Sequence, residues 1–145
     1  MRKLPSLVFE PLHDLNLLVV HEGENDPTDA DWDVYFRTIE SMSTKKPLRV
    51  LVVTDGGSPS AAQRRKLLAL TRRQRPKIAV VTARVRIRFM LSIFALVNQD
   101  TRSYLPTQLG AALAYLGLTA IEAKTVSELV AQMRVALRAP GPMEA

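Results

Sequence analysis

Two short runs rich in β-branched residues constrain the fold most: LRVLVVT at 48–54 and KIAVVT at 77–82. Each is apolar at consecutive positions, which is typical of a strand covered on both faces. The interval between them carries a helical pattern that begins with Pro59 and is closed by Pro76. A strand–helix–strand unit of this kind predicts parallel strands in an α/β architecture.

The flanking segments extend the same alternation. SLVFEP (6–11) and LNLLVVHEG (15–23) predict an antiparallel hairpin that turns at His13 and Asp14. Thr28-x-x-Asp31 predicts the cap of a helix whose buried face repeats at helical spacing. That face consists of Trp32, Tyr35, Phe36 and Ile39.

The second half of the chain predicts further elements. They are helices over 59–73 and 85–97, a strand at TRSYL (101–105), a short helix at 106–117 that stops at Gly117, and a last helix capped by Thr125 and Glu128. We therefore expect one domain over residues 1–138, with a flexible tail at 139–145.

Composition excludes several classes of protein. The 145 residues include no cysteine, which rules out disulfides, a thiol nucleophile and cysteine-ligated metal sites. The basic start is followed within a few residues by prolines and acids, so we do not expect a signal peptide. The most apolar run, 89–97, is far shorter than the roughly 20 residues that span a bilayer. We expect a cytoplasmic protein with no membrane span.

Charge is distributed unevenly along the chain. Residues 56–99 contain ten Lys and Arg and no acid, whereas residues 22–33 contain six acids. This polarity suits an anionic partner, or pairing of the two halves in a homo-oligomer.

The turn that follows the strand at 48–54 is the first candidate site. It contains Asp55, Gly56, Gly57, Ser58 and Ser60. The glycines permit a sharp reversal, Ser58 is the expected N-cap, and Pro59 suits the first helical position. An anion site or a phosphorylated serine at this helix start is the functional alternative. A plain helix cap is favoured, because neither a P-loop nor a dinucleotide motif is present.

LRVLVVTDGGSPSAAQRR (48–65) and the segment from Arg75 to Leu118 together resemble the SpoIIAA-like, or STAS-like, family. The resemblance covers roughly residues 7–117 and rests on the order of elements. It implies an α/β fold with a mixed, mainly parallel sheet of about five strands, an N-terminal hairpin, and four to five helices.

The resemblance also implies a non-enzymatic regulatory module without a cofactor. Anti-sigma factor antagonists of this family bind a partner kinase and are released when a serine in an Asp-Ser-Ser-Gly motif is phosphorylated. Asp55 matches the aspartate of that motif, but Gly56 and Gly57 stand at the serine positions. Serines follow at Ser58 and Ser60, and we expect a regulator or kinase as a protein partner.

A basic strip on the helix at 59–73 is the second candidate site. Arg65 and Arg72 fall on one line of the helix, and Lys66 and Arg73 fall on the next. A solvated helix face is the commoner meaning of such a strip, and an acidic protein surface or nucleic acid is the functional one. Nucleic acid is not favoured, because the stretch lacks aromatic residues for base stacking.

An apolar face on the helix at 85–97 is the third candidate. Only Arg88 and Ser92 are polar within 87–97, so the helix is apolar around most of its circumference. A functional surface and deeper burial under the last helix fit this pattern about equally. The functional surface would be a homodimer interface or a groove for a lipid-like ligand, and dimerisation is the form we expect. The face comprises Ile87, Phe89, Met90, Ile93, Phe94 and Val97.

Catalytic and metal sites are not expected. The acids Asp29, Asp31, Asp33 and Glu40 have calcium-loop spacing, but Val34 replaces the required glycine. The two histidines, His13 and His21, are interpreted as polar residues at the edges of the hairpin, because no nucleophile lies near them in the sequence.

Overall fold

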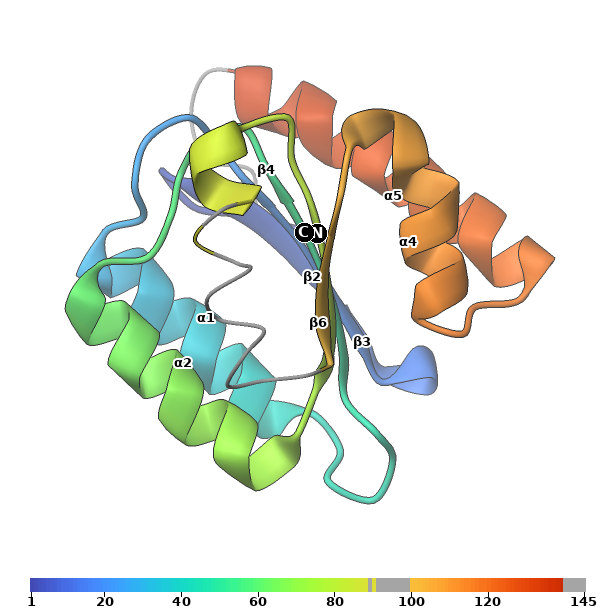
Figure 1. The fold of residues 1–145 in the computed structure, drawn as a ribbon, viewed down its shortest axis with the longest axis horizontal. Helices are drawn as coiled ribbons and strands as arrows, with labels where there is room; N and C mark the ends of the chain where they lie inside the picture. Colours follow the sequence, from blue (N-terminus) through green and yellow to red (C-terminus); the bar gives the residue numbers. More distant parts are fainter. Residues whose placement is uncertain (89, 91–99, 140–145) are drawn as a thin grey trace.

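The computed structural model describes residues 1–88, 90 and 100–139, and these residues form a layered α/β fold (Figure 1). The sheet has six strands that lie side by side in chain order. They are β1 (Arg2–Lys3), β2 (Leu7–Leu12), β3 (Leu17–Glu22), β4 (Arg49–Thr54), β5 (Lys77–Val81) and β6 (Thr101–Tyr104).

Strand pairing explains the mixed character of the sheet. The first two pairs, β1 with β2 and β2 with β3, are antiparallel, whereas β3, β4, β5 and β6 are mutually parallel. The hairpin and the mainly parallel sheet were both predicted. The sixth strand, β1, was not predicted, because a pair of basic residues carries no strand pattern.

Helices cover both faces of the sheet. In Figure 1, α1 (Asp29–Ser41) and α2 (Ala61–Gln74) lie on one side, and α4 (Leu109–Tyr115) and α5 (Ala120–Arg138) lie on the other. Short 3₁₀ turns, η1 (His13–Leu15) and η2 (Pro106–Gln108), occupy the hairpin loop and the approach to α4. Residues 85–88 are helical, as predicted, and most of the predicted helix at 85–97 lies outside the described residues.

Alternation along each strand divides the core into two clusters. Leu17 and Val19 of β3 pack with α4 and α5, whereas Leu18 and Val20 pack with α1 and α2. The predicted aromatic face of α1 is buried in the second cluster, where Trp32 and Tyr35 meet edge to face with ring centroids 5.2 Å apart. The protein therefore has two hydrophobic cores, one on each face of the same sheet.

Two helix starts differ from the prediction. The N-cap of α2 is Ser60, and Pro59 precedes it, so the prediction of Ser58 as the cap was wrong. The N-cap of α5 is Thr119, which forms a capping box with Glu122, and Thr125 lies inside the helix with its hydroxyl bonded to the Ile121 carbonyl. In both cases the helix begins at a Ser/Thr-x-x-Gln/Glu box, but for α5 the sequence contains two such boxes.

Candidate functional site

The turn at 55–60 follows β4 at the carboxyl edge of the parallel strands. All five N–H donors of its non-proline residues are already bonded within the protein. Gly57 donates to the Gly23 carbonyl at 2.8 Å, and Ser58 donates to Asp26 Oδ1 at 3.1 Å. An anion site needs outward-facing N–H groups, so this turn offers a phosphate no backbone cradle between residues 55 and 60.

The two glycines are required by geometry. Gly56 has a φ of +148°, a conformation that side chains rarely adopt. A Cβ atom on Gly57 would lie 2.4 Å from the Asn25 carbonyl oxygen and 2.9 Å from that of Gly23. Serines in the Asp-Ser-Ser-Gly arrangement therefore do not fit at these two positions.

The two serines of the turn have different surroundings. Ser60 is exposed and accepts a hydrogen bond from the Gln63 N–H, while the Gln63 side chain accepts one from the Ser60 N–H. Ser58 is half-buried and faces the apolar cavity described below. Asp26 and Asp29 both lie at this helix start, bonded to Ser58 and Gln63. Their charges oppose a phosphate on either serine.

His21 lies beside Asp55 at the same edge. Its ring is fully buried, and Nε2 lies 3.3 Å from Asp55 Oδ2. Burial lowers the pKa of His21 below its usual 6.5, against the opposing effect of Asp55. The interpretation of His21 as an edge residue was wrong, whereas His13 is exposed in η1 as expected.

A polar groove of about 800 Å³ opens around Asp55. Arg84 closes one end by donating from Nε to the Asp55 carbonyl at 3.0 Å. Acidic side chains from the 23–28 loop and basic side chains from α5 both line the groove. These are Glu24 and Asp26 on the loop, and Arg134 and Arg138 on the helix. The groove therefore presents both signs of charge to a partner.

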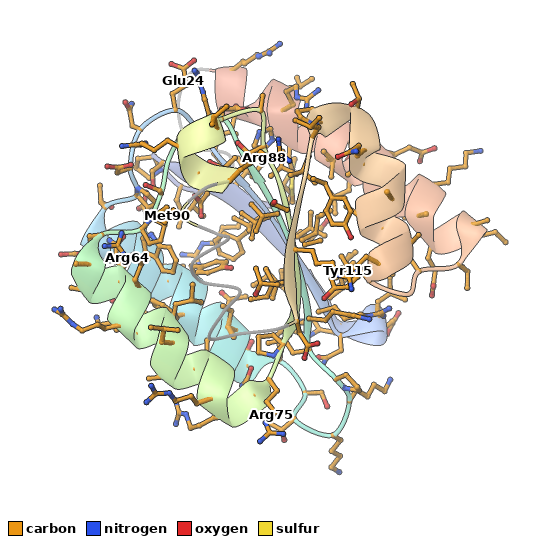
Figure 2. The ribbon with its side chains drawn as sticks, in the orientation of Figure 1. Glu24, Arg64, Arg75, Arg88, Met90 and Tyr115 are labelled. Atoms are coloured by element: carbon orange, nitrogen blue, oxygen red, sulfur yellow. The ribbon has the colours of Figure 1, made fainter. Side chains whose placement is uncertain are left out.

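A second, mostly apolar cavity of about 100 Å³ lies between the sheet and the helices α1 and α2. Its lining includes Trp32 and Tyr35 from α1 and Leu67 and Leu70 from α2. Arg64 and Met90 also line it, and Arg64 Nη1 lies 3.7 Å from the Met90 sulfur (Figure 2).

Glu22 at the end of β3 lines this apolar cavity. Glu22 is only 6% exposed. Burial, with a smaller contribution from Asp26, raises the pKa of Glu22 to about 8. The carboxyl group is therefore protonated at neutral pH. Burial and the proximity of Glu22 also raise the pKa of Tyr35.

Sequence reasoning missed Glu22 as a site residue. We grouped it with the acids of 22–33 because the strand ends there and acids follow. The available signal was the alternation of β3, which places Glu22 on the same face as the buried Leu18 and Val20.

The basic strip is exposed on α2. Arg65, Lys66, Arg72 and Arg73 are all accessible to solvent. Lys66 Nζ lies 3.5 Å from Asp33 Oδ1 of α1, so part of the strip is paired with an acid of the same chain. This pairing joins the acidic and basic halves of the sequence within one molecule.

The predicted apolar face at 87–97 is only partly described. Ile87 is buried and Met90 is half-buried, and both line the apolar cavity. Ile87 therefore packs inward, which removes it from an exposed dimer face. The remaining members, Phe89, Ile93, Phe94 and Val97, lie outside the described residues.

The acids with calcium-loop spacing do not converge. Asp31 accepts hydrogen bonds from the N–H and hydroxyl of Ser6, and Asp33 faces Lys66. Within residues 1–88, 90 and 100–139, no cluster of three or more His, Asp or Glu is placed to hold a metal ion. In the same part of the chain, no helix is long and apolar enough to cross a membrane.

No family model, no curated protein and no solved structure matches the chain at a significant level.

Proposed function

We propose that this chain is a cytoplasmic, STAS-like regulatory module that binds a protein partner and carries out no chemistry of its own. The order of its elements supports this proposal, since a hairpin leads into parallel strands and β4 ends in Asp55 and a tight turn. The partner would be a regulator or a kinase, as in the family that the sequence resembles.

The polar groove around Asp55 is the contact surface in this proposal. It is open, it lies at the carboxyl edge where loops from several strands meet, and it is lined by Arg134 and Arg138 as well as Glu24 and Asp26. Groups of both signs on one surface favour a protein segment with complementary charges over a uniformly charged polymer. The proposal rests on the presence of this groove and on the charges that line it.

A pair of charge reversals tests it. The tagged chain is crosslinked in cells of its own organism and purified as wild type, as Arg134→Glu/Arg138→Glu, and as Arg72→Glu/Arg73→Glu. The two variants change net charge equally, but only the first alters the groove. We expect the first to lose a specifically crosslinked protein at least tenfold, as removal of about 1.4 kcal/mol of binding free energy would produce. Equal recovery with all three chains contradicts the proposal.

Binding of an anionic partner through the α2 strip is the second candidate, and it is supported by the exposure of all four of its cations. Salt-dependent retention of the protein on mixed DNA, lost in Arg72→Glu/Arg73→Glu and kept in Arg134→Glu/Arg138→Glu, would favour this function. Absence of retention at low salt removes it.

The proposed module also forms a homodimer through the 87–97 segment. Replacement of Phe89 and Phe94 by serine should convert a dimer to a folded monomer in a measurement of mass in solution. A wild-type chain that is monomeric at micromolar concentration contradicts this part alone.

A further inference from the structure

Several buried polar side chains line the apolar cavity between α1, α2 and the sheet. Glu22 of β3 is 6% exposed and Tyr35 of α1 is 4% exposed, and both line the cavity. Trp32 and Thr101 also line the cavity, and Trp32 Nε1 and Thr101 Oγ1 are buried without a hydrogen-bond partner in the described part of the chain. Each unsatisfied buried group of this kind costs about 1–3 kcal/mol.

The chemistry of these four groups is similar. Indole N–H groups can only donate hydrogen bonds, and phenol and alcohol hydroxyls readily do so. A carboxyl group that keeps its proton in an apolar site is also a donor. A ligand that pairs with these groups would therefore carry a hydrogen-bond acceptor, and the apolar lining excludes an ion with a full hydration shell.

The size of the cavity limits the ligand. An engineered apolar cavity of about 150 Å³ binds benzene, so the 100 Å³ found here suits a molecule with roughly five or six non-hydrogen atoms. Arg64 lies at the same cavity, with Nη1 bonded to the Pro59 carbonyl at 3.0 Å, and its positive charge disfavours a cationic ligand.

We propose that this cavity binds a small, uncharged, largely apolar molecule with one carbonyl-type acceptor, and that the Glu22 carboxyl group donates a hydrogen bond to that acceptor. The site is distinct from the polar groove, because Thr54 is the one described residue that lines both.

Cyclopentanone is a suitable probe, with cyclopentane and cyclopentylamine as controls of similar shape. Trp32 is the only tryptophan of the chain and lines the cavity, so its single indole N–H signal in a ¹H–¹⁵N spectrum reports occupancy. We expect a saturable shift of this signal with cyclopentanone and affinity roughly tenfold higher than for cyclopentane, as one net hydrogen bond provides.

Variants at Glu22 identify the donor. Glu22→Gln retains an N–H donor and should keep the preference for the ketone, whereas Glu22→Leu should remove the preference while still admitting cyclopentane. In the wild type the preference should disappear at about pH 9.5 and return at about pH 6, and in Glu22→Gln it should not change. The other charged or titratable groups near Glu22 are Tyr35, Arg64 and Asp26, and their charges are the same in both chains.

Three results would overturn the inference. No saturable shift with any probe means that water or the chain itself fills the cavity. Equal affinity for cyclopentanone and cyclopentane means that no donor is used. Tighter binding of cyclopentylamine means that Glu22 acts as a carboxylate towards a cation. None of these results bears on the polar groove, so the proposed function is tested separately.

Discussion

Under α4 and α5 the sheet meets a core of aliphatic side chains, including Leu113 and Met133, that are almost completely buried. Under α1 and α2 the same strands meet three aromatic rings, a cavity of about 100 Å³ and the carboxyl group of Glu22. One face is filled with aliphatic side chains, whereas the other retains a cavity with polar groups in its lining. The proposed ligand site rests on this difference in packing.

His21 and Glu22, which are adjacent in β3, lie on the two different faces of the sheet. Burial keeps both neutral in the folded protein. Below about pH 6.5 the unfolded chain binds a proton at His21 that the folded chain does not, so stability falls in acid. Between about pH 4.5 and 8 the folded chain retains a proton at Glu22 that the unfolded chain has lost, so stability falls as the pH rises.

Glu22→Gln should have the largest effect. One retained proton changes the free energy of unfolding by up to about 1.4 kcal/mol per pH unit, so the wild type should lose several kcal/mol of stability between pH 5 and 8 through this group alone. The variant should lack this loss, as measured by urea unfolding across the pH range. Glu24→Gln, at an exposed neighbour, is the control. Parallel pH profiles for Glu22→Gln and wild type contradict a neutral Glu22.

Leucine truncations on the two faces should have the next largest effects. Leu113 of α4 is 1% exposed in the dense core, and Leu70 of α2 is 4% exposed beside the cavity. Leu→Ala in a core costs about 2–5 kcal/mol, and the cost is greatest where the surroundings cannot relax. We expect Leu113→Ala to cost about 1 kcal/mol more than Leu70→Ala in chemical denaturation. Equal costs would mean that the faces are equally packed.

Glycine substitutions compare the turn above the cavity with a helix on the dense face. Gly57→Ala forces its Cβ against the Asn25 carbonyl and should destabilise the protein by about 1–3 kcal/mol. Gly110→Ala in α4 meets no atom within 4 Å and should stabilise the protein by up to about 1 kcal/mol. Thermal unfolding of both variants measures the difference. If Gly57→Ala were neutral, the turn would be looser than the structure shows.

Helix caps should show the smallest effects. Ser60→Ala and Thr119→Ala each remove the side-chain acceptor of a capping box and should cost about 1 kcal/mol. Ser58→Ala should cost little, since the Ser58 hydroxyl makes no hydrogen bond to a described residue. A larger loss at Ser58 than at Ser60 in the same unfolding measurement would restore the original prediction for α2.

The sequence was informative where one local pattern sufficed. The aromatic face of α1 and the apolar runs of β4 and β5 predicted buried elements, and the structure confirms them. Cap positions were less certain, because Thr119-x-x-Glu122 and Thr125-x-x-Glu128 satisfy the same rule. The first of these two boxes is the one used. It follows closely on the end of α4, since Gly117, with a φ of +77°, lies two residues before Thr119.

The candidate site was harder to predict than the fold. The 55–60 turn was identified, but its donors are used by residues 22–26 and 54 and by Gln63, and no local pattern reveals such contacts. Glu22 and His21 resemble ordinary polar residues at the end of a strand. Their burial depends on tertiary packing against helices, α1 for Glu22 and α5, which is distant in sequence, for His21.

The sequential order of the strands has a consequence for synthesis of the chain. Each strand pairs with the one made just before it, so the sheet can grow outwards from the first hairpin while the ribosome is still translating. On the face of the sheet opposite α1, the last helix, α5, covers β2 and β3. A truncated product that stops before residue 120 would therefore expose the oldest strands, and a protease should remove it readily.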